Sequence, residues 1–216
     1  MDISYDNHAE GYDASGPNTT ISFTNAGNYL FAVTPVSYTT LTFNGVSASV
    51  LQDWTPNGSP FGGNCPPIRV WGLANPYIGT ANIVTNGYTN KISCASYFGV
   101  NPSDVQPESS NYVDSSAGQQ TGTYTNATVT KEGGWIIGFT RYADYRTVNG
   151  QSGTTIRSNA CGNLFSDGSA IFDLNSSKTA GTYSSGVDLS SSSTFFTMIV
   201  MAISPKPPFV GQMNIL

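Results

Sequence analysis

Small polar residues dominate this chain, since 93 of its 216 residues are Ser, Thr, Asn or Gly and only 21 are charged. Short apolar or alternating runs lie between them at intervals of roughly ten residues, a spacing typical of β-sandwiches and barrels. Small polar residues supply turns and solvent-facing strand positions, and aromatic and β-branched residues fill the inward positions. Because helical periodicity is absent, the pattern predicts an all-β fold.

The expected strands can be placed by residue number. They are 19–24, 28–34, 39–43, 46–51, 68–73, 80–85, 91–98, 121–130, 135–142, 169–174 and 195–204. Runs 135–142 and 195–204 are apolar at nearly every position, which predicts central strands covered on both faces. The Thr-rich run 121–130 is typical of an edge strand. Asn44-Gly45 and Asn86-Gly87 favour type I′ hairpin turns.

We therefore expect a single antiparallel two-sheet β-sandwich, because all-β domains of about 200 residues are common. The predicted sandwich spans 18–204, between an N-terminal arm at 1–17 and a C-terminal arm at 205–216. The 26 aromatic residues can supply its core, since each ring buries roughly 150–250 Å². Long irregular segments at 53–67 and 144–153 are interpreted as loops.

Charge argues against several classes of partner. The net charge is −5, and no Lys or Arg precedes Arg69. Nucleic-acid binding needs a basic stripe that displaces counterions from phosphates, and anionic membranes are disfavoured for the same reason. The N-terminus lacks the basic and apolar regions of a signal peptide, and no apolar run approaches the ~20 residues of a membrane span. Surface-type composition without an export signal is typical of a phage structural protein, which predicts a virion-surface or extracellular location.

Three motifs carry a resemblance to a known class of module. FNG at 43–45, the WGLANPYIGT run at 71–80 and FGV at 98–100 stand in an order similar to that of jelly-roll-type β-sandwich modules. Such modules recur in phage virion proteins, as decoration or fibre subunits, and in bacterial surface proteins. The resemblance covers about 28–204 and rests on turn and core residues. It implies a jelly-roll-like sandwich with a display or adhesion role, and no catalytic residue.

The sequence contains few residues that could form a catalytic or metal-binding site. His8 is the single histidine, and the acidic residues around it could form a calcium site or a solvated acidic segment, of which we favour the second. The carboxylate pairs that glycosidases require have only two candidates, Asp104 with Glu108 and Asp167 with Asp173, and neither has a supporting motif. We expect no enzyme activity and no cofactor.

The three cysteines do not match a structural zinc site, which requires four closely spaced ligands. Cys94 lies in an apolar run and is interpreted as a buried hydrophobic residue. Cys65 and Cys161 both lie in Gly- and Asn-rich surroundings, so a disulfide between them is an alternative that the sequence leaves undecided. The odd number of cysteines argues against it.

Aromatic and apolar residues in the loops and the C-terminal arm are the better functional candidates. Loop aromatics can stack on sugars or on a partner protein, and the alternative is that they close the ends of the sandwich. The apolar residues of the arm should be buried on the chain itself or on a neighbour. The predicted partner- or ligand-binding residues are Trp54, Phe61, Tyr142, Tyr145, Arg146, Phe209, Met213, Ile215 and Leu216.

These observations favour a non-enzymatic phage virion structural protein, either a capsid decoration subunit or part of a head or tail fibre. Its predicted partners are other virion proteins or copies of itself. The alternative is a carbohydrate-binding adhesin or receptor-binding module that recognises a host-surface glycan. A sandwich-fold glycosidase is a third, weaker hypothesis.

Overall fold

The structure is a computed structural model that describes residues 2–12, 18–55, 66–86, 91–103, 109–115, 123–143, 148–151, 153–161, 167–189 and 195–208. For 12, 109–115, 123, 124, 161 and 167 it describes the backbone alone. Every element formed by these residues is a β-strand, and every strand pairing is antiparallel. The predicted all-β, antiparallel fold is confirmed.

The strands fall into two successive halves of the chain. The first half contains β1 (Ser4–Tyr12), β2 (Asn18–Asn25), β3 (Tyr29–Thr34), β4 (Leu41–Phe43), β5 (Val46–Ser47), β6 (Ser49–Trp54), β7 (Ile68–Ala74), β8 (Gly79–Asn86) and β9 (Lys91–Phe98). The second half contains β10 (Ser109–Ser115), β11 (Thr123–Val129), β12 (Trp135–Ala143), β13 (Val148–Gly150), β14 (Thr155–Cys161), β15 (Asp167–Asp173), β16 (Gly181–Leu189) and β17 (Phe196–Ile203).

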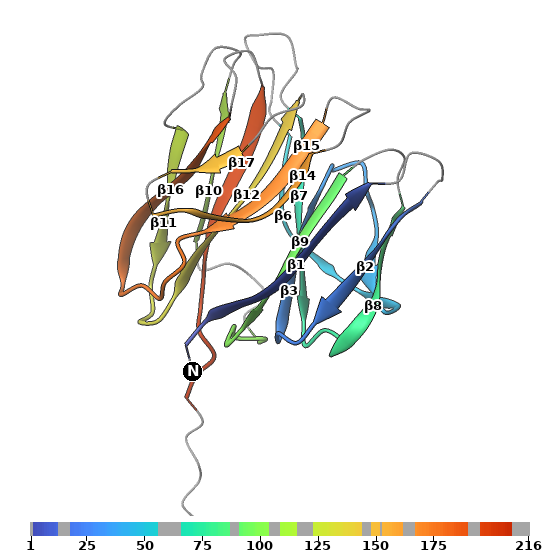
Figure 1. Cartoon of the computed structure of the whole chain (residues 1–216). Helices are drawn as coiled ribbons and strands as arrows, with labels where there is room; N and C mark the ends of the chain where they lie inside the picture. Colours follow the sequence, from blue (N-terminus) through green and yellow to red (C-terminus); the bar gives the residue numbers. More distant parts are fainter. Residues whose placement is uncertain are drawn as a thin grey trace, which may run out of the picture.

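Four sheets are present where the sequence predicted two. The first half forms an inner sheet, β1-β9-β3-β7-β6, and an outer sheet, β2-β8-β4-β5. The second half forms an inner sheet, β10-β17-β12-β15-β14, and an outer sheet, β11-β16-β13. Core clusters lie between each outer sheet and its inner sheet and between the two inner sheets. The four layers therefore run outer, inner, inner, outer across the molecule (Figure 1).

The two halves share one strand order. Each strand of the second half has a counterpart in the first: β10 corresponds to β1, β11 to β2, β12 to β3, β13 to β4, and β14 to β17 correspond to β6 to β9. With this correspondence the inner sheets have the same order, and so do the outer sheets apart from the additional β5. The chain therefore contains an internal structural repeat, which the sequence-based prediction of one sandwich did not detect.

Details of register support the repeat. The β6–β7 ladder skips Leu51, and the β14–β15 ladder skips Arg157 at the corresponding place. A β-bulge of this kind leaves one residue unpaired and bends the strand. On the outer sheets, Thr24 pairs with Thr80 beside Gly79, and Thr128 pairs with Thr182 beside Gly181. The hydroxyls of both Thr pairs lie within hydrogen-bonding distance, 2.8 Å in the first half and 3.1 Å in the second.

The largest core cluster lies between the two inner sheets and joins the halves. Phe31 of β3 and Phe139 of β12 meet there with ring centroids 5.9 Å apart, and Tyr97 contacts Trp135 at 6.4 Å. β12 and β17 are central strands that are buried along almost their whole length. Their two faces are covered by the other inner sheet and by their own outer sheet, as their continuous apolar sequence predicted.

The predicted Asn-Gly hairpin is confirmed. Asn44 and Gly45 connect β4 and β5, and both have positive φ, 50° and 77°. This is the backbone that a type I′ turn requires at its two central positions. The second predicted hairpin, at Asn86-Gly87, lies partly outside the described residues. The edge position of 121–130 is confirmed in part, because β11 lies at the edge of its outer sheet.

Five strands did not have the expected apolar pattern. β1 lies where an N-terminal arm was predicted, β13 lies in a predicted loop, and β10, β14 and β16 were not identified. β1 is a correction to the predicted arm at 1–17, because Ser4–Tyr12 forms the edge of the first inner sheet. Its sequence is polar because several of its side chains make hydrogen bonds instead of filling an apolar core: Asp6 binds the turn at 25–28, and Glu10 binds β14 of the second half.

Candidate functional site

One end of the molecule, which we call the base, is built from turns that bond to one another. Asn28 donates its backbone N–H to Tyr97 at 2.9 Å, and Asn75 donates to Asn28 at 2.9 Å. In the second half, Gly133 donates to Lys178 at 3.0 Å. The turns at 25–28, 75–78, 99–103, 130–134, 174–180 and 204–208 therefore lie at the same end. Both the first described residues and the last ones are found there (Figure 1).

The segments that follow the last strand of each half, 99–101 and 204–206, pair with each other at the base. Val100, just after β9, forms an isolated bridge with Pro205, just after β17. Asn101 donates its N–H to Ser204 at 3.1 Å, and Lys206 donates to Gly99 at 2.6 Å. Gly99 has a φ of 71°, and a Cβ atom there would lie 2.2 Å from a backbone oxygen of the N-terminal segment. This tight packing fixes the direction in which the chain leaves the body after β17.

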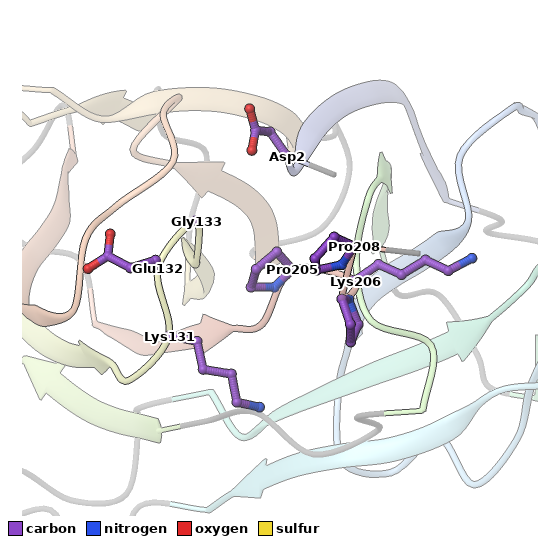
Figure 2. Close-up of a pocket in the computed structure, with 8 residues that line it drawn as sticks. Asp2, Lys131, Glu132, Gly133, Pro205, Lys206 and Pro208 are labelled. Carbon is purple, nitrogen blue, oxygen red and sulfur yellow. The ribbon is translucent and has the colours of Figure 1, made fainter. Parts of the chain in front are cut away.

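A pocket of about 280 Å³ lies beside this pairing. Figure 2 shows its lining side chains, and the residues around it are Asp2, Lys131, Glu132, Gly133, Pro205, Lys206, Pro207 and Pro208. Lys131 donates to the Ser204 hydroxyl at 3.3 Å, and Glu132 accepts the backbone N–H of Ala180 at 3.2 Å. The lining mixes both signs of charge with proline rings, which suits a protein partner better than a charged small molecule.

Three large apolar side chains are exposed at the base. Tyr77 is 48% exposed, Ile78 is 61% exposed and Phe98 is 39% exposed. The turn at 25–28 lies between them, because Asn25 donates its side-chain amide to the backbone oxygen of Tyr77 at 2.8 Å and the same turn bonds to Tyr97. We call Tyr77, Ile78 and Phe98 the base patch.

The second half shows that the fold does not require these apolar residues. β16 begins at Gly181 as β8 begins at Gly79, so Thr179 and Ala180 stand where Tyr77 and Ile78 stand in the first half. Ile203 pairs with Trp135 as Tyr97 pairs with Tyr29, so Ser204 corresponds to Phe98. The same positions thus carry small or polar residues in one half and large apolar residues in the other. An exposed apolar group that the fold does not need is typical of an interaction site.

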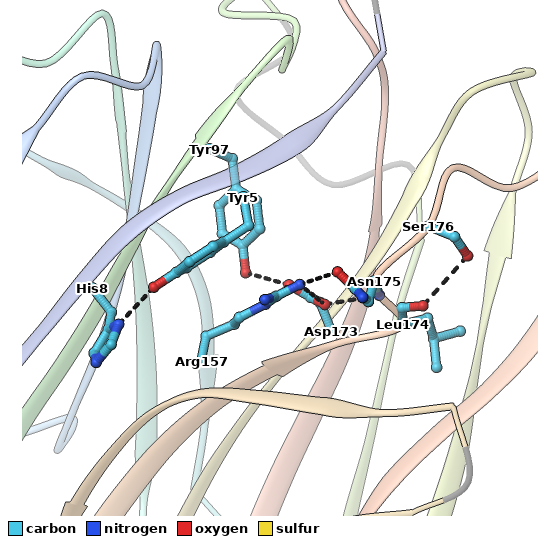
Figure 3. A network of polar contacts seen from close by, with 8 residues as sticks. All are labelled: Tyr5, His8, Tyr97, Arg157, Asp173, Leu174, Asn175 and Ser176. Atoms are coloured by element: carbon cyan, nitrogen blue, oxygen red, sulfur yellow. Dashed lines mark hydrogen bonds and ion pairs between the residues drawn. The ribbon is translucent and has the colours of Figure 1, made fainter.

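A polar network crosses between the inner sheets above the base (Figure 3). The Arg157 guanidinium binds Asp173 through Nε at 2.7 Å and Nη2 at 3.0 Å, and the Tyr97 hydroxyl donates to Asp173 at 3.0 Å. Arg157 also lies over the Tyr5 ring, 4.3 Å from its centroid, and the Tyr5 hydroxyl lies 2.6 Å from Nδ1 of His8. Asp173 is fully buried and both of its oxygens are occupied, so this network connects the halves.

Burial governs the chemistry of the network. Removal from water raises the pKa of the Tyr97 hydroxyl well above its usual value, and the negative charge of Asp173 acts in the same direction. Tyr97 therefore remains a neutral hydrogen-bond donor at physiological pH. His8, the single histidine of the chain, lies at the exposed edge of the network. Its Nδ1 atom is within hydrogen-bonding distance of the Tyr5 hydroxyl.

The acidic residues of β1 bind protein donors. Asp6 accepts the backbone N–H groups of Ala26 and Gly27, each at 2.8 Å, and Glu10 accepts the N–H of Asn159 at 2.6 Å. Within the ranges that the structure describes, no group of three or more His, Cys, Asp or Glu side chains is placed to hold a metal ion. Asp13, Asp104 and Glu108 lie outside the described residues.

The predicted binding residues are not brought together by the described part of the chain. Trp54, at the end of β6, is partly buried against the central cluster. Tyr142 is fully buried in the second half, and its hydroxyl donates to Asn159 at 2.6 Å. It therefore fills the core, the alternative that the sequence had left open. Outside the described residues lie Phe61, Tyr145, Arg146, Phe209, Met213, Ile215 and Leu216. The base patch was missed, although an aromatic and an isoleucine directly after Asn75-Pro76 were a usable signal.

Cys94 is a buried free thiol, as its apolar surroundings predicted. Burial raises its pKa to about 12, so almost no thiolate forms at neutral pH. The Cys65→Ser/Cys161→Ser variant keeps Cys94 as its single cysteine. We expect this variant to remain unlabelled by iodoacetamide at pH 8 when it is folded, and to react fully in denaturant. Rapid labelling of the native variant would show that Cys94 is accessible. Cys65 and the side chain of Cys161 lie outside the described residues, so the disulfide between them stays a hypothesis.

No protein-family model matches the chain, and no curated protein or solved structure does. The part of the chain that the structure describes contains no helix able to cross a membrane.

Proposed function

We propose that the chain is a non-enzymatic phage virion structural protein, a capsid decoration or head or tail fibre subunit, displayed on the particle and attached by its base. The observation that carries the proposal is the base itself. It gathers the exposed apolar patch, the first described residues and the segment 204–208 after β17 at one end of the molecule. A displayed protein needs one attachment end and an opposite end that faces the surroundings.

We further propose that each half is a jelly-roll-like sandwich. Most consecutive strands of the first half alternate between its sheets: β1, β3, β7 and β9 lie in the inner sheet, and β2, β4 and β8 lie in the outer one. The exceptions are β5, which stays in the outer sheet with β4, and β6, which lies in the inner sheet with β7. This alternation is what wrapping an antiparallel hairpin around two sheets produces. Fold alone does not determine function, so this likeness supports display only together with the base.

Purified particles of the source phage test the proposal directly. We expect mass spectrometry to find the chain in many copies per particle, and antibodies against it to label intact particles. Chain that is absent from washed particles but abundant in the lysate would refute a structural role. The Ile78→Lys variant should enter particles less well than the wild-type chain, because a charge on the base patch opposes burial against a partner.

A second candidate function, binding of a neutral glycan, is favoured by a groove on the outer sheet of the first half. The groove measures about 490 Å³ and is lined by uncharged residues that include Ser22, Asn44, Thr80 and Asn82. Hydroxyl and amide groups of this kind can hydrogen-bond to sugars. Selective binding on a glycan array that is lost in Asn82→Ala would favour this candidate.

A further inference from the structure

The chain contains four Asn-Gly pairs, at 44–45, 57–58, 86–87 and 149–150. In such a pair the backbone nitrogen of the glycine can attack the asparagine side chain, because glycine has no Cβ to hinder the approach. Asparagine is accordingly one of the thermolabile residues of proteins. The local sequence makes the four pairs alike, so the fold decides which of them reacts. The pair at 57–58 lies outside the described residues.

The asparagine at 44 is held loosely. Asn44 and Gly45 are both exposed at the tip of a hairpin, and a Cβ atom added at Gly45 would meet no atom within 4 Å beyond its chain neighbours. Among the residues that the structure describes, the Asn44 side-chain amide has no hydrogen-bond partner. The hairpin is closed by β5, which has two residues and lies at the edge of its sheet. A short exposed edge of this kind opens locally at low cost.

The side-chain amide of Asn86 is held on both sides. Its oxygen accepts the backbone N–H groups of Thr39 at 3.0 Å and of Thr40 at 2.8 Å, and the Thr40 hydroxyl at 2.9 Å. Its nitrogen donates to the Thr39 hydroxyl at 2.6 Å. Attack on Asn86 has to disrupt these four bonds. Gly87 lies outside the described residues, so the comparison rests on the Asn86 side chain.

The pair at 149–150 is held through its backbone. Asn149 lies inside β13, and the residues on both sides of it, Val148 and Gly150, pair with β16. A Cβ atom at Gly150 would lie 2.2 Å from the backbone oxygen of Thr154. The Gly150 nitrogen therefore has little room to turn toward the Asn149 side chain. Of the three pairs considered, Asn44-Gly45 has the fewest restraints on the reaction.

We propose that Asn44 is a site of spontaneous deamidation, which converts the groove on the outer sheet of the first half from a neutral surface into an acidic one. The backbone nitrogen of Gly45 attacks Cγ of Asn44, and the new N–Cγ bond closes a succinimide ring. The amide nitrogen of Asn44 leaves as ammonia together with the proton of the Gly45 N–H. Water then opens the ring at either carbonyl, which gives aspartate or isoaspartate. Water is the single co-reactant.

The reaction changes the groove because both residues of the turn line it. The other lining residues are uncharged: Ser22, Thr80, Ala81, Asn82 and Val84. Either product adds one carboxylate to this surface. Asp-Gly suits a type I′ turn, so the aspartate product keeps the hairpin, whereas isoaspartate adds a carbon to the backbone of a two-residue turn. The proposal goes beyond the proposed function, since it requires neither a particle nor a bound glycan.

Peptide mapping of aged protein tests the proposal. The purified full chain is incubated at pH 8, digested with chymotrypsin and analysed by mass spectrometry, with an unaged sample digested in parallel. Cleavage after Phe43, Trp54, Tyr77 and Tyr145 places the four pairs on separate peptides. We expect the Asn44 peptide to gain one mass unit at least about tenfold faster than the Asn86 peptide, because four hydrogen bonds restrain Asn86. Equal rates in the folded chain, or faster conversion of Asn86, would overturn the proposal.

Two controls assign the difference to the fold. In denaturant the Asn44 and Asn86 rates should converge, and an Asn44 peptide that stays as much faster there would contradict the proposal. Thr39→Val removes the hydroxyl that accepts the Asn86 amide, so it should accelerate conversion of Asn86 and leave Asn44 unchanged. The Asn44→Asp variant supplies the reference peptide that separates aspartate from isoaspartate by chromatography. Absence of the chain from particles would refute the proposed function and leave these rates as they are.

Discussion

Replacing Asp173 with alanine should lower the free energy of unfolding by about 3–5 kcal/mol, because it leaves a buried guanidinium without its partner. The Arg157 side chain is 13% exposed and Asp173 is fully buried, so water can replace the lost carboxylate only in part. The Tyr97 hydroxyl would lose its acceptor at the same time. Chemical denaturation followed by tryptophan fluorescence would measure the change.

Two comparisons make this prediction specific. Asp53→Ala removes the partner of Arg69 from a pair in which Asp53 is 40% exposed, and should cost at most about 1 kcal/mol. The double variant Arg157→Leu/Asp173→Gly installs the residues that stand at the corresponding bulge of the first half, Leu51 and Gly72. It should recover part of the loss, since well-packed apolar residues can replace a buried ion pair. A single Asp173→Ala variant as stable as the wild type would show that the network around Asp173 does not stabilise the fold.

Ile137→Ala should destabilise the protein by about 2–5 kcal/mol, the usual range for a large-to-small change in a core. Ile137 is fully buried on β12 in the cluster between the inner sheets, so the cavity would open where the two halves meet. Val46→Ala is the control, because Val46 is exposed on β5. Equal effects of the two substitutions would contradict the assignment of this cluster as the shared core.

Much of the fold could be predicted from local pattern. Apolar runs located β12 and β17, and Asn44-Gly45 located the first hairpin, because continuous burial and positive φ each restrict the residues that fit. The number of sheets could not be predicted in this way. Period-two alternation shows that a strand has a buried face, and it does not show which sheet covers that face. β1 was missed because its polar side chains form hydrogen bonds instead of an apolar face: Asp6 binds the turn at 25–28, and Glu10 binds the second half.

The candidate site was less accessible to sequence reasoning. Tyr77, Ile78 and Phe98 lie at the same end of the molecule because the turn at 25–28 bonds both to Tyr77 and to Tyr97. Their significance also depends on comparison with Thr179 and Ala180, and the correspondence becomes visible only through the strand register. Tyr77 and Ile78 differ from their counterparts Thr179 and Ala180, so a comparison of the two halves by residue identity does not reveal the repeat at these positions. The binding roles of Trp54 and of the 209–216 segment stay predictions.

Cross-linking mass spectrometry on intact particles tests the central proposal, attachment through the base, most directly. Lys131 and Lys206 line the pocket at the base, and Lys178 lies on the neighbouring turn. An amine-reactive reagent should therefore join these lysines to other particle proteins or to a second copy of the chain. The account predicts cross-links from all three, and fewer from Ile78→Lys particles. Particles that contain the chain but yield no cross-link from Lys131, Lys178 or Lys206 to any other molecule would contradict it.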